Sequence, residues 1–489
     1  MAWGLSTALN VSSSSLQTKQ KQMSIVSTNA ANVDNQYYHK RSATVENLDL
    51  SGDETGGATG VYLSNVTRSY DAVLENSLKS AVSSDSYQQE YLTRMSQLEQ
   101  LLGADGSNPL STAVSNFATA LQNVSSNPES ISYRTALLSA GKALSTEFNQ
   151  EYSSMGSLRD SIASNAAAGS GYLANETSEA DDLLNQIAKL NKSIQSVESQ
   201  NISGQQALDL RDQRDQLVKK LAAYADVSVT ENSNGQYTVD LNLENGTKTL
   251  IDGSVVPQPA ASQLKVTMTE GPTGFYIPSL AVVDPDGTKT PVTLAGESGS
   301  LQALLDSRDY ATTQMTNLYE FAAALSKQIN TLQNNPNSYD LNGKSNQGNF
   351  FSSPTSQPAK GSILGLDSYI AGNPRLIAAS DAAGQNGNGN VATAMWNIMN
   401  QDGLFKDESL MDYSDRILAN TAQAVADTKT MAENTANVVK MYTSAVSEKS
   451  GVSMDEEMVN MLALQRAYQA SSKMISTVDE MIKTVLNMV

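Results

Sequence analysis

Few residues of this 489-residue chain could do chemistry, because it contains a single histidine and no cysteine. Any Ser-His-Asp triad or histidine-dependent metal site would have to be built around His39. That residue lies in the polar stretch from Tyr37 to Arg41, so we predict a solvated loop position for it. Without cysteine the chain forms neither disulfides nor thiolate metal sites, which is compatible with any redox compartment.

Neighbouring carboxylates are the other chemical candidates. Asp181 and Asp182 are adjacent, but adjacent helical residues point in different directions, so we expect them on the polar side of a helix rather than as a glycosidase acid pair. Asp284, Asp286 and Gly287 resemble part of a calcium loop without its closing glutamate, and we predict a plain turn. Phosphate-binding glycine motifs and basic patches with interleaved aromatics are absent from the sequence. We therefore predict no catalytic, cofactor-binding or metal site.

Composition favours an elongated helical protein that does not bind nucleic acid. Lys and Arg number 32 against 51 Asp and Glu, a net charge of −19, and such an acidic surface repels nucleic acid and anionic membranes. Hydrophobic residues make up 39% but aromatic residues only 6%, which suits long solvated helices better than a compact enzyme. We expect no membrane insertion and, since the first residues lack the features of a secretory signal, no Sec-dependent export.

Both ends of the chain carry apolar residues at alternating steps of three and four, the spacing of a coiled-coil seam. Ser453 and Glu456 form a capping box at the start of the last helix, and Met474, Met481 and Met488 add a second apolar stripe. Burying one Leu, Ile or Val is worth roughly 1.5–3 kcal/mol, so the two helices need each other or copies of themselves. The seam residues are Leu5, Leu9, Leu16, Met23, Val26 and Val33, and Met461, Leu464, Tyr468, Ile475, Val478, Ile482 and Val485.

Between the terminal helices we predict a helical bundle interrupted by one β-region. Asn127, Pro128 and Glu129 predict an N-cap, a first-turn proline and an acid that complements the helix dipole. Alternating Val and Thr separated by pairs such as Asn234-Gly235 predict hairpins. The fold class is mainly α, an α+β multidomain chain: paired terminal helices at 1–33 and 452–489; a helical bundle at 34–225, 300–335 and 391–451 with a short hairpin near 42–67; an inserted β-domain at 226–299; and an irregular surface segment at 336–390.

Several of these stretches resemble a known family. The bend from Asn29 to Tyr38 and the residues from Gly60 to Asp71 resemble the axial proteins of the bacterial flagellum. Within that group, the internal runs resemble the hook-associated proteins of the hook–filament junction. At Asn35-Gln36-Tyr37-Tyr38 the chain departs from the Thr-Pro-Gly-Tyr-like turn usual in the family. The internal runs are Asn127-Pro128, Ile187-Ala188-Lys189-Leu190-Asn191, DLRDQRDQLVKKL at 209–221, 299–309, 373–378 and 451–475.

The resemblance implies a structural protein of the extracellular flagellum, exported through the flagellar type III apparatus, that catalyses nothing and needs no cofactor. It implies a ring of subunits at the hook–filament junction, on which the filament is assembled. The seam residues would then be its assembly interface. The implied partners are further copies of the chain, the hook protein, a second junction protein and an export chaperone at the C-terminal helix.

Two alternatives remain open at this stage. The first is another axial role, as hook protein or second junction protein, against which the long helical blocks at 129–222 and 300–334 argue. The second is a cell-wall glycoside hydrolase, which would need a pair of carboxylates in a cleft. Its candidates lie in the β-insert and are Asp240, Glu244, Asp252 and Asp284.

Overall fold

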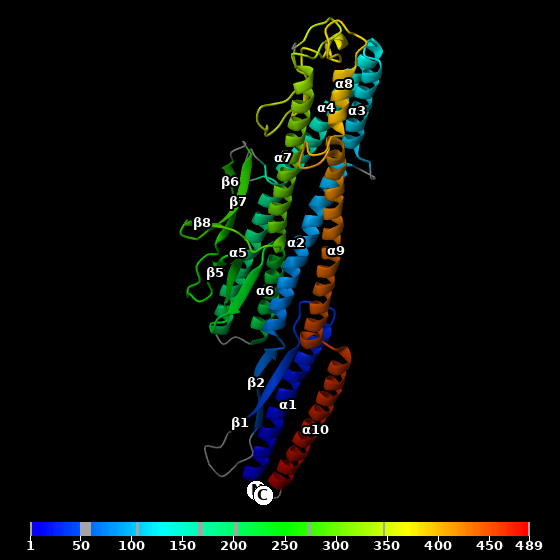
Figure 1. Cartoon of the computed structure of the whole chain (residues 1–489). Helices are drawn as coiled ribbons and strands as arrows, with labels where there is room; N and C mark the ends of the chain where they lie inside the picture. The colour runs from blue at the N-terminus through cyan, green and yellow to red at the C-terminus, as the bar shows by residue number, and fades with distance from the viewer. Residues whose placement is uncertain are drawn as a thin grey trace.

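A computed structural model describes residues 2–48, 60–103, 107–164, 170–199, 204–271, 275–345 and 348–487. The molecule is elongated and mainly helical with small β-sheets, which confirms the predicted fold class (Figure 1). Both termini lie at one end, where α1 (Ala2–Ala31) runs beside α10 (Met454–Asn487). Among the helices in the described part of the chain, none combines the length and apolar composition that a membrane span requires.

A two-stranded ribbon lies along the terminal helix pair. Strands β1 (Arg41–Leu48) and β2 (Gly60–Arg68) are antiparallel, so the strands of the predicted hairpin are confirmed, while its tip at 49–59 lies outside the described residues. The hydroxyl of Thr18 in α1 donates a hydrogen bond to the Val61 carbonyl, 3.0 Å away. The ribbon therefore packs on α1 and ends where the bundle begins.

The bundle rises from the terminal pair and carries the β-region on one side (Figure 1). Its aromatic core includes Phe117, Phe148 and Phe321, each of which is 0% exposed. Helices α2 and α9 run side by side and connect directly to the terminal end. The bundle helices are α2 (Ala72–Leu102), α3 (Pro109–Ser126), α4 (Ile131–Ile162), α5 (Tyr172–Ser199), α6 (Gly204–Tyr224), α7 (Gly299–Gln333), α8 (Asn390–Met399) and α9 (Leu410–Ser450).

One predicted helix start is wrong. Asn127 is the C-cap of α3, and α4 opens later, where the Ser130 hydroxyl accepts the Tyr133 backbone N–H. The expected combination of asparagine and proline does open a helix at the other end of α3, at Asn108 and Pro109. Asparagine before proline favours a helix boundary of either kind, so the pair alone does not distinguish a start from a stop.

The β-region consists of two small antiparallel sheets. The first contains β3 (Val227–Glu231), β4 (Tyr237–Leu243) and β5 (Gly246–Ile251); the second contains β6 (Gln263–Glu270), β7 (Tyr276–Val283) and β8 (Lys289–Val292). A bridge between Leu243 and Leu294 joins them. Apolar side chains such as Val239 and Leu241 pack with α5 and α6 in one cluster. Gly287, with φ of 88°, closes the predicted plain turn between β7 and β8.

The segment 336–390 is irregular as predicted. Its described residues form only β9 (Phe351–Ser352), β10 (Gly365–Leu366) and a 3-10 helix (Pro374–Leu376). Many of its residues are exposed, but the segment is not confined to the surface, because several of its apolar side chains are buried in the main core. Bundle asparagines satisfy the buried backbone: Asn330 donates to the Phe351 carbonyl and Asn149 to the Leu364 carbonyl, both at 2.8 Å. The buried side chains are Phe350, Phe351, Ile363, Leu364, Ile370 and Ile377.

Candidate functional site

Helices α1 and α10, which carry the predicted seams, lie side by side within the chain. The hydroxyls of Ser15 and Ser471 lie 3.2 Å apart between the two helices, and Gln20 donates to the Tyr468 hydroxyl at 3.3 Å. Of the predicted seam residues, Val26 and Val478 are buried, Val485 is exposed and the other ten are half-buried. One chain therefore covers the seams only in part.

Helix α10 leaves much of its apolar surface in water. Along its 34 residues only Glu457 and Val478 are buried. Met474 and Met481 of the predicted second stripe are 55% and 52% exposed, and Met488 lies outside the described residues. The exposed apolar residues of α10 are Met454, Met458, Val459, Leu462, Met474, Met481, Val485 and Leu486, eight of the twenty such large side chains in the described ranges.

Asn29 closes the bend at the end of α1. Its amide nitrogen donates to the Arg41 carbonyl at 2.9 Å and to Glu457 of α10 at 3.1 Å. Its amide oxygen accepts the Tyr38 hydroxyl at 2.7 Å and the Arg41 backbone N–H at 3.0 Å. Lys40 adds ion pairs to α10, at 2.7 Å to Glu456 and 3.4 Å to Glu457. One side chain, Asn29, thus ties α1, the bend, β1 and α10 together.

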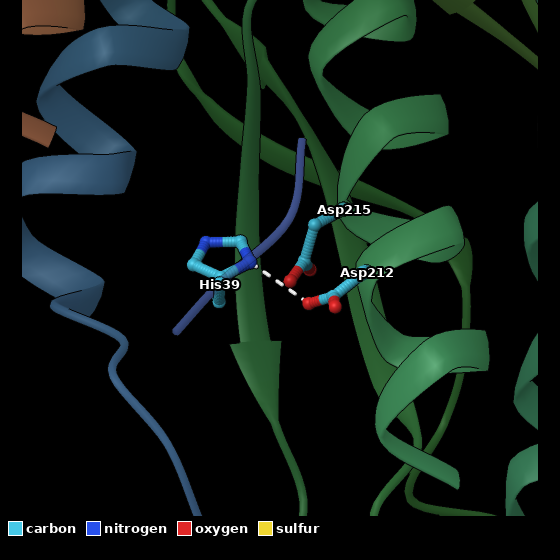
Figure 2. Close-up of side chains that lie close together, drawn as sticks. All are labelled: His39, Asp212 and Asp215. Atoms are coloured by element: carbon cyan, nitrogen blue, oxygen red, sulfur yellow. Dashed lines mark hydrogen bonds and ion pairs between the residues drawn. The ribbon is translucent and has the colours of Figure 1, made fainter. Parts of the chain in front are cut away.

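His39 is buried, so its predicted solvated position is wrong. Its Nδ1 lies 2.8 Å from Asp212 of α6, as Figure 2 shows, and its Nε2 lies 3.4 Å from Glu75 of α2. Burial would lower the pKa of His39, but the hydrogen bonds to these two carboxylates outweigh it and raise the pKa to about 9. The ring is therefore an imidazolium at neutral pH. The bend is polar in sequence, yet α2 and α6 cover it in the fold.

Two arginines complete a set of ion pairs that we call the polar hub. Arg41, 2% exposed, bonds to Asp209 and Asp212, and Arg68 of β2 lies 3.2 Å from Asp212. Arg68 also binds Asp215, which accepts the Tyr237 hydroxyl of β4 at 2.6 Å. Burial would raise the pKa of Asp215, but Arg68 and this hydroxyl hold it below its usual value. The hub comprises Asn29, His39, Lys40, Arg41, Arg68, Glu75, Asp209, Asp212, Asp215 and Glu457.

His39, Asp212 and Asp215 also have the donor types of a metal site, with ligand atoms within 4.8 Å of one another (Figure 2). Metal binding requires a neutral imidazole and carboxylates with free lone pairs. Here the guanidinium of Arg68 contacts both aspartates, and His39 carries a proton. A cation would have to displace Arg68 and that proton together. We therefore interpret the cluster as an ion-pair network.

The other acids considered from sequence have structural partners. Asp181 is buried and accepts the Leu264 backbone N–H at 2.7 Å, so its predicted place on a polar face is wrong, whereas Asp182 is exposed. Each remaining acid bonds to its own neighbour: Asp240 to Thr249 across the β4–β5 pair, Asp252 to Ser254, and Asp284 to Lys248 and Ser262. The backbone N–H of Glu244 donates to Thr293 in a turn.

The hub was missed from sequence although a signal was present. Asp209, Asp212 and Asp215 recur at every third residue, which places them along one face of α6. Three acids on one face, in a helix flanked by apolar positions, predict a facing set of cations. The sequence does not say which cations these are, because Arg41 and Arg68 are far from α6 along the chain.

Comparison with known families agrees with this architecture. Residues 443–488, which form the end of α9 and most of α10, match the family model described as flagellar basal body rod FlgEFG protein C-terminal. The terminal helix is thus that of a flagellar protein. Residues 95–351 match the model described as flagellar hook-associated protein FlgK helical domain, and the chain belongs to this FlgK family. The resemblance inferred from sequence is confirmed.

Individual relatives extend the match over the whole chain. The chain is 26% identical to flagellar hook-associated protein 1 of Bacillus subtilis, over 99% of this chain and 97% of that protein. It is 31% identical to the Salmonella typhimurium protein of the same name, over 71% of this chain and 60% of that one. The hook junction protein FlgK of Burkholderia pseudomallei shares the fold, with a TM-score of 0.60 and 16% identity over 76% of this chain and 99% of that chain. The chain is a structural protein of the extracellular flagellum with a role at the hook–filament junction.

Proposed function

We propose that the chain forms an adaptor ring between hook and filament, on which the filament is assembled. Its axial core would be the terminal helices, 1–33 and 452–489. The bundle (34–225, 300–335 and 391–451) and the β-domain (226–299) would lie outside that core. The observation that carries this proposal is the set of exposed apolar side chains along α10, which a single chain does not cover.

The free energy of burying these side chains favours association through α10. Covering the exposed apolar side chains of α10, from Met458 at 58% exposure to Leu486 at 70%, would contribute on the order of 10 kcal/mol. Association of rigid partners costs about 4–15 kcal/mol, so a single contact is marginal and a closed ring with two contacts per subunit is favoured. The acidic surface of the remaining chain would face water.

We base the proposed partners on these exposed side chains. Copies of the chain would meet them side by side, with the hook protein on one side of the ring and a second junction protein on the other. Before assembly, an apolar helix in water needs a shield, which supports an export chaperone at α10. Asp240, Asp252 and Asp284 of the β-domain are bonded to neighbouring side chains, which supports a purely structural role without catalysis.

A matched pair of substitutions tests the proposal. Met481 of α10 and Met431 of α9 are equally exposed, at 52% and 51%. We expect Met481→Asp to abolish filaments on hooks in cells that carry only this variant, and Met431→Asp to leave them intact. The secreted amount and the melting temperature of each variant should equal those of the unsubstituted chain. Filaments of normal number in both variants would contradict an assembly role for α10.

A further inference from the structure

The connection between the terminal helix pair and the bundle is narrow. Three chain segments cross it: 31–41, 68–72 and 450–454. Backbone hydrogen bonds hold them together, since the Lys40 N–H donates to the Ser450 carbonyl at 2.7 Å and the Ser69 N–H donates to the Lys40 carbonyl at 2.8 Å. The Ser69 hydroxyl donates to the Lys449 carbonyl, also at 2.8 Å. We call this crossing the joint.

Neither of the two large apolar clusters extends across the joint. One lies in the bundle and the other between the β-domain and α5, α6 and α7. Within the described ranges, neither includes a side chain of α1, β1, β2 or α10. The main hydrophobic cores therefore do not set the angle between the terminal pair and the bundle.

Charge pairs span the joint instead. Lys40 reaches α10 through Glu456 and Glu457, and Arg41, next in the chain, reaches α6 through Asp209 and Asp212. Ion pairs and hydrogen bonds depend on direction and distance, so they specify an angle. A buried charge that loses its partner is costly, so moving the terminal helix pair away from the bundle is unfavourable while every ion pair of the hub is intact. Removing one of these ion pairs by substitution lowers that cost.

The joint also contains free space. A cleft of about 160 Å³ lies beside the hub, between the bend at 32–39, the start of α2, α6 and the end of α9. No side chain of the described residues fills this space, so the end of α9 has room to move against the bend. Lys219 and Glu75 are the charged groups that line the cleft together with His39 and Asp215. From α9 only Thr443, Val446, Ser447 and Ser450 line it, and none of these carries a charge.

We propose that the hub is a charge lock on a hinge: its ion pairs hold the terminal helix pair at one angle to the bundle, and loss of a link lets the pair swing. His39 is one link, facing Asp212 and Glu75 with Arg68 nearby, and Lys40 is another. The lock is a property of the single chain and does not depend on the assembly proposed above. In a ring it would let subunits adjust their inner helices to neighbours of different geometry.

The absence of cysteine makes the hinge measurable. Paired cysteines at Glu433 of α9 and Asn460 of α10, both exposed, would carry spin labels across the joint. The labels would lie roughly 40 Å apart, from ~1.5 Å rise per residue along two nearly continuous helices. A reference pair at Glu433 and Thr135 lies within the bundle.

Lys40→Gln removes the links to α10, and Lys483→Gln is its control, because Lys483 also pairs with an acid of α10 at 2.7 Å but far from the joint. In pulsed electron spin resonance we expect Lys40→Gln at least to double the width of the distance distribution across the joint. The Lys483→Gln and reference-pair distributions should stay narrow. Equal widths in Lys40→Gln and the unsubstituted chain, or a distribution already broad in the latter, would overturn the lock.

His39→Gln is the second variant. Its cross-joint distribution at pH 7 should be as broad as that of the unsubstituted chain at pH 10, where His39 has lost its proton, and should not change with pH. An unsubstituted chain whose distribution stays narrow at pH 10, together with a narrow His39→Gln, would overturn the part assigned to His39. The reference pair verifies in each case that the bundle is folded.

Discussion

Two aspartates of α6 allow a sharp test of the hub. Asp212 and Asp209 both bind Arg41 through the same nitrogen, but their side chains are 10% and 56% exposed. Asp212 also holds His39 at 2.8 Å and Arg68 at 3.2 Å. Asp212→Asn therefore removes the carboxylate that His39, Arg41 and Arg68 share. Asp209→Asn removes a charge that water largely screens.

The expected magnitudes differ widely. Removing one partner of a buried charge pair costs about 3–5 kcal/mol, and removing one from an exposed pair costs about 0–1 kcal/mol. Because a chain of several structural regions does not unfold in one step, the cost is best read locally. The backbone N–H groups of Lys40 and Arg41 are suitable probes, since both donate hydrogen bonds at the joint.

Native-state hydrogen exchange measures this cost directly. Each 1.4 kcal/mol changes an opening equilibrium about tenfold, so Asp212→Asn should accelerate exchange of the two amides by at least ~100-fold and Asp209→Asn by less than ~5-fold. Amides in α3 and α4 should exchange at unchanged rates in both variants. Similar acceleration by the two substitutions would refute the view that the buried hub holds the joint.

Three further predictions concern stability. The pKa of His39 in the folded chain is about 9, above its ordinary 6.5, so the protonated ring contributes about 3 kcal/mol to the free energy of unfolding. This contribution is complete below pH 6.5 and is lost as the pH rises through 9. In denaturant titrations, the difference in stability between the unsubstituted chain and His39→Gln should therefore disappear over that range. Phe350→Ala should lower the free energy of unfolding by about 3–5 kcal/mol, because the ring is 0% exposed. A decrease of less than ~1 kcal/mol in urea unfolding would contradict the burial of this ring in the core. Gly299→Ala should lower the melting temperature in calorimetry, because φ is 75° and the new Cβ would lie 2.4 Å from the Tyr224 carbonyl oxygen; an unchanged melting temperature would contradict this strain.

The regular elements could be predicted because their signals are local. Helix α10 begins at Met454, directly after the Ser453 that the capping pattern indicates, and the backbone N–H of Glu457 donates to the Ser453 carbonyl at 3.0 Å. The turn at Gly287 follows in the same way from a glycine that accepts positive φ. Such features depend on residues a few positions apart, and the sequence contains them.

Burial of the irregular parts could not be predicted in this way. His39 is surrounded by polar neighbours in sequence, and only the arrival of Glu75 and Asp212 from two helices buries it. Phe350 and Ile363 are separated by polar residues and show no periodicity, yet they meet Phe117 and other bundle residues in the core. Both cases depend on which distant element covers a loop, which composition and spacing do not contain.

The junction role is tested most directly by electron microscopy of flagella from cells that lack this chain, with the culture medium assayed for flagellin. If the chain forms the ring on which the filament is built, hooks should be present without filaments, and flagellin should accumulate in the medium. Expression of the intact chain should restore filaments. Normal filaments in the cells without the chain would contradict the proposed function.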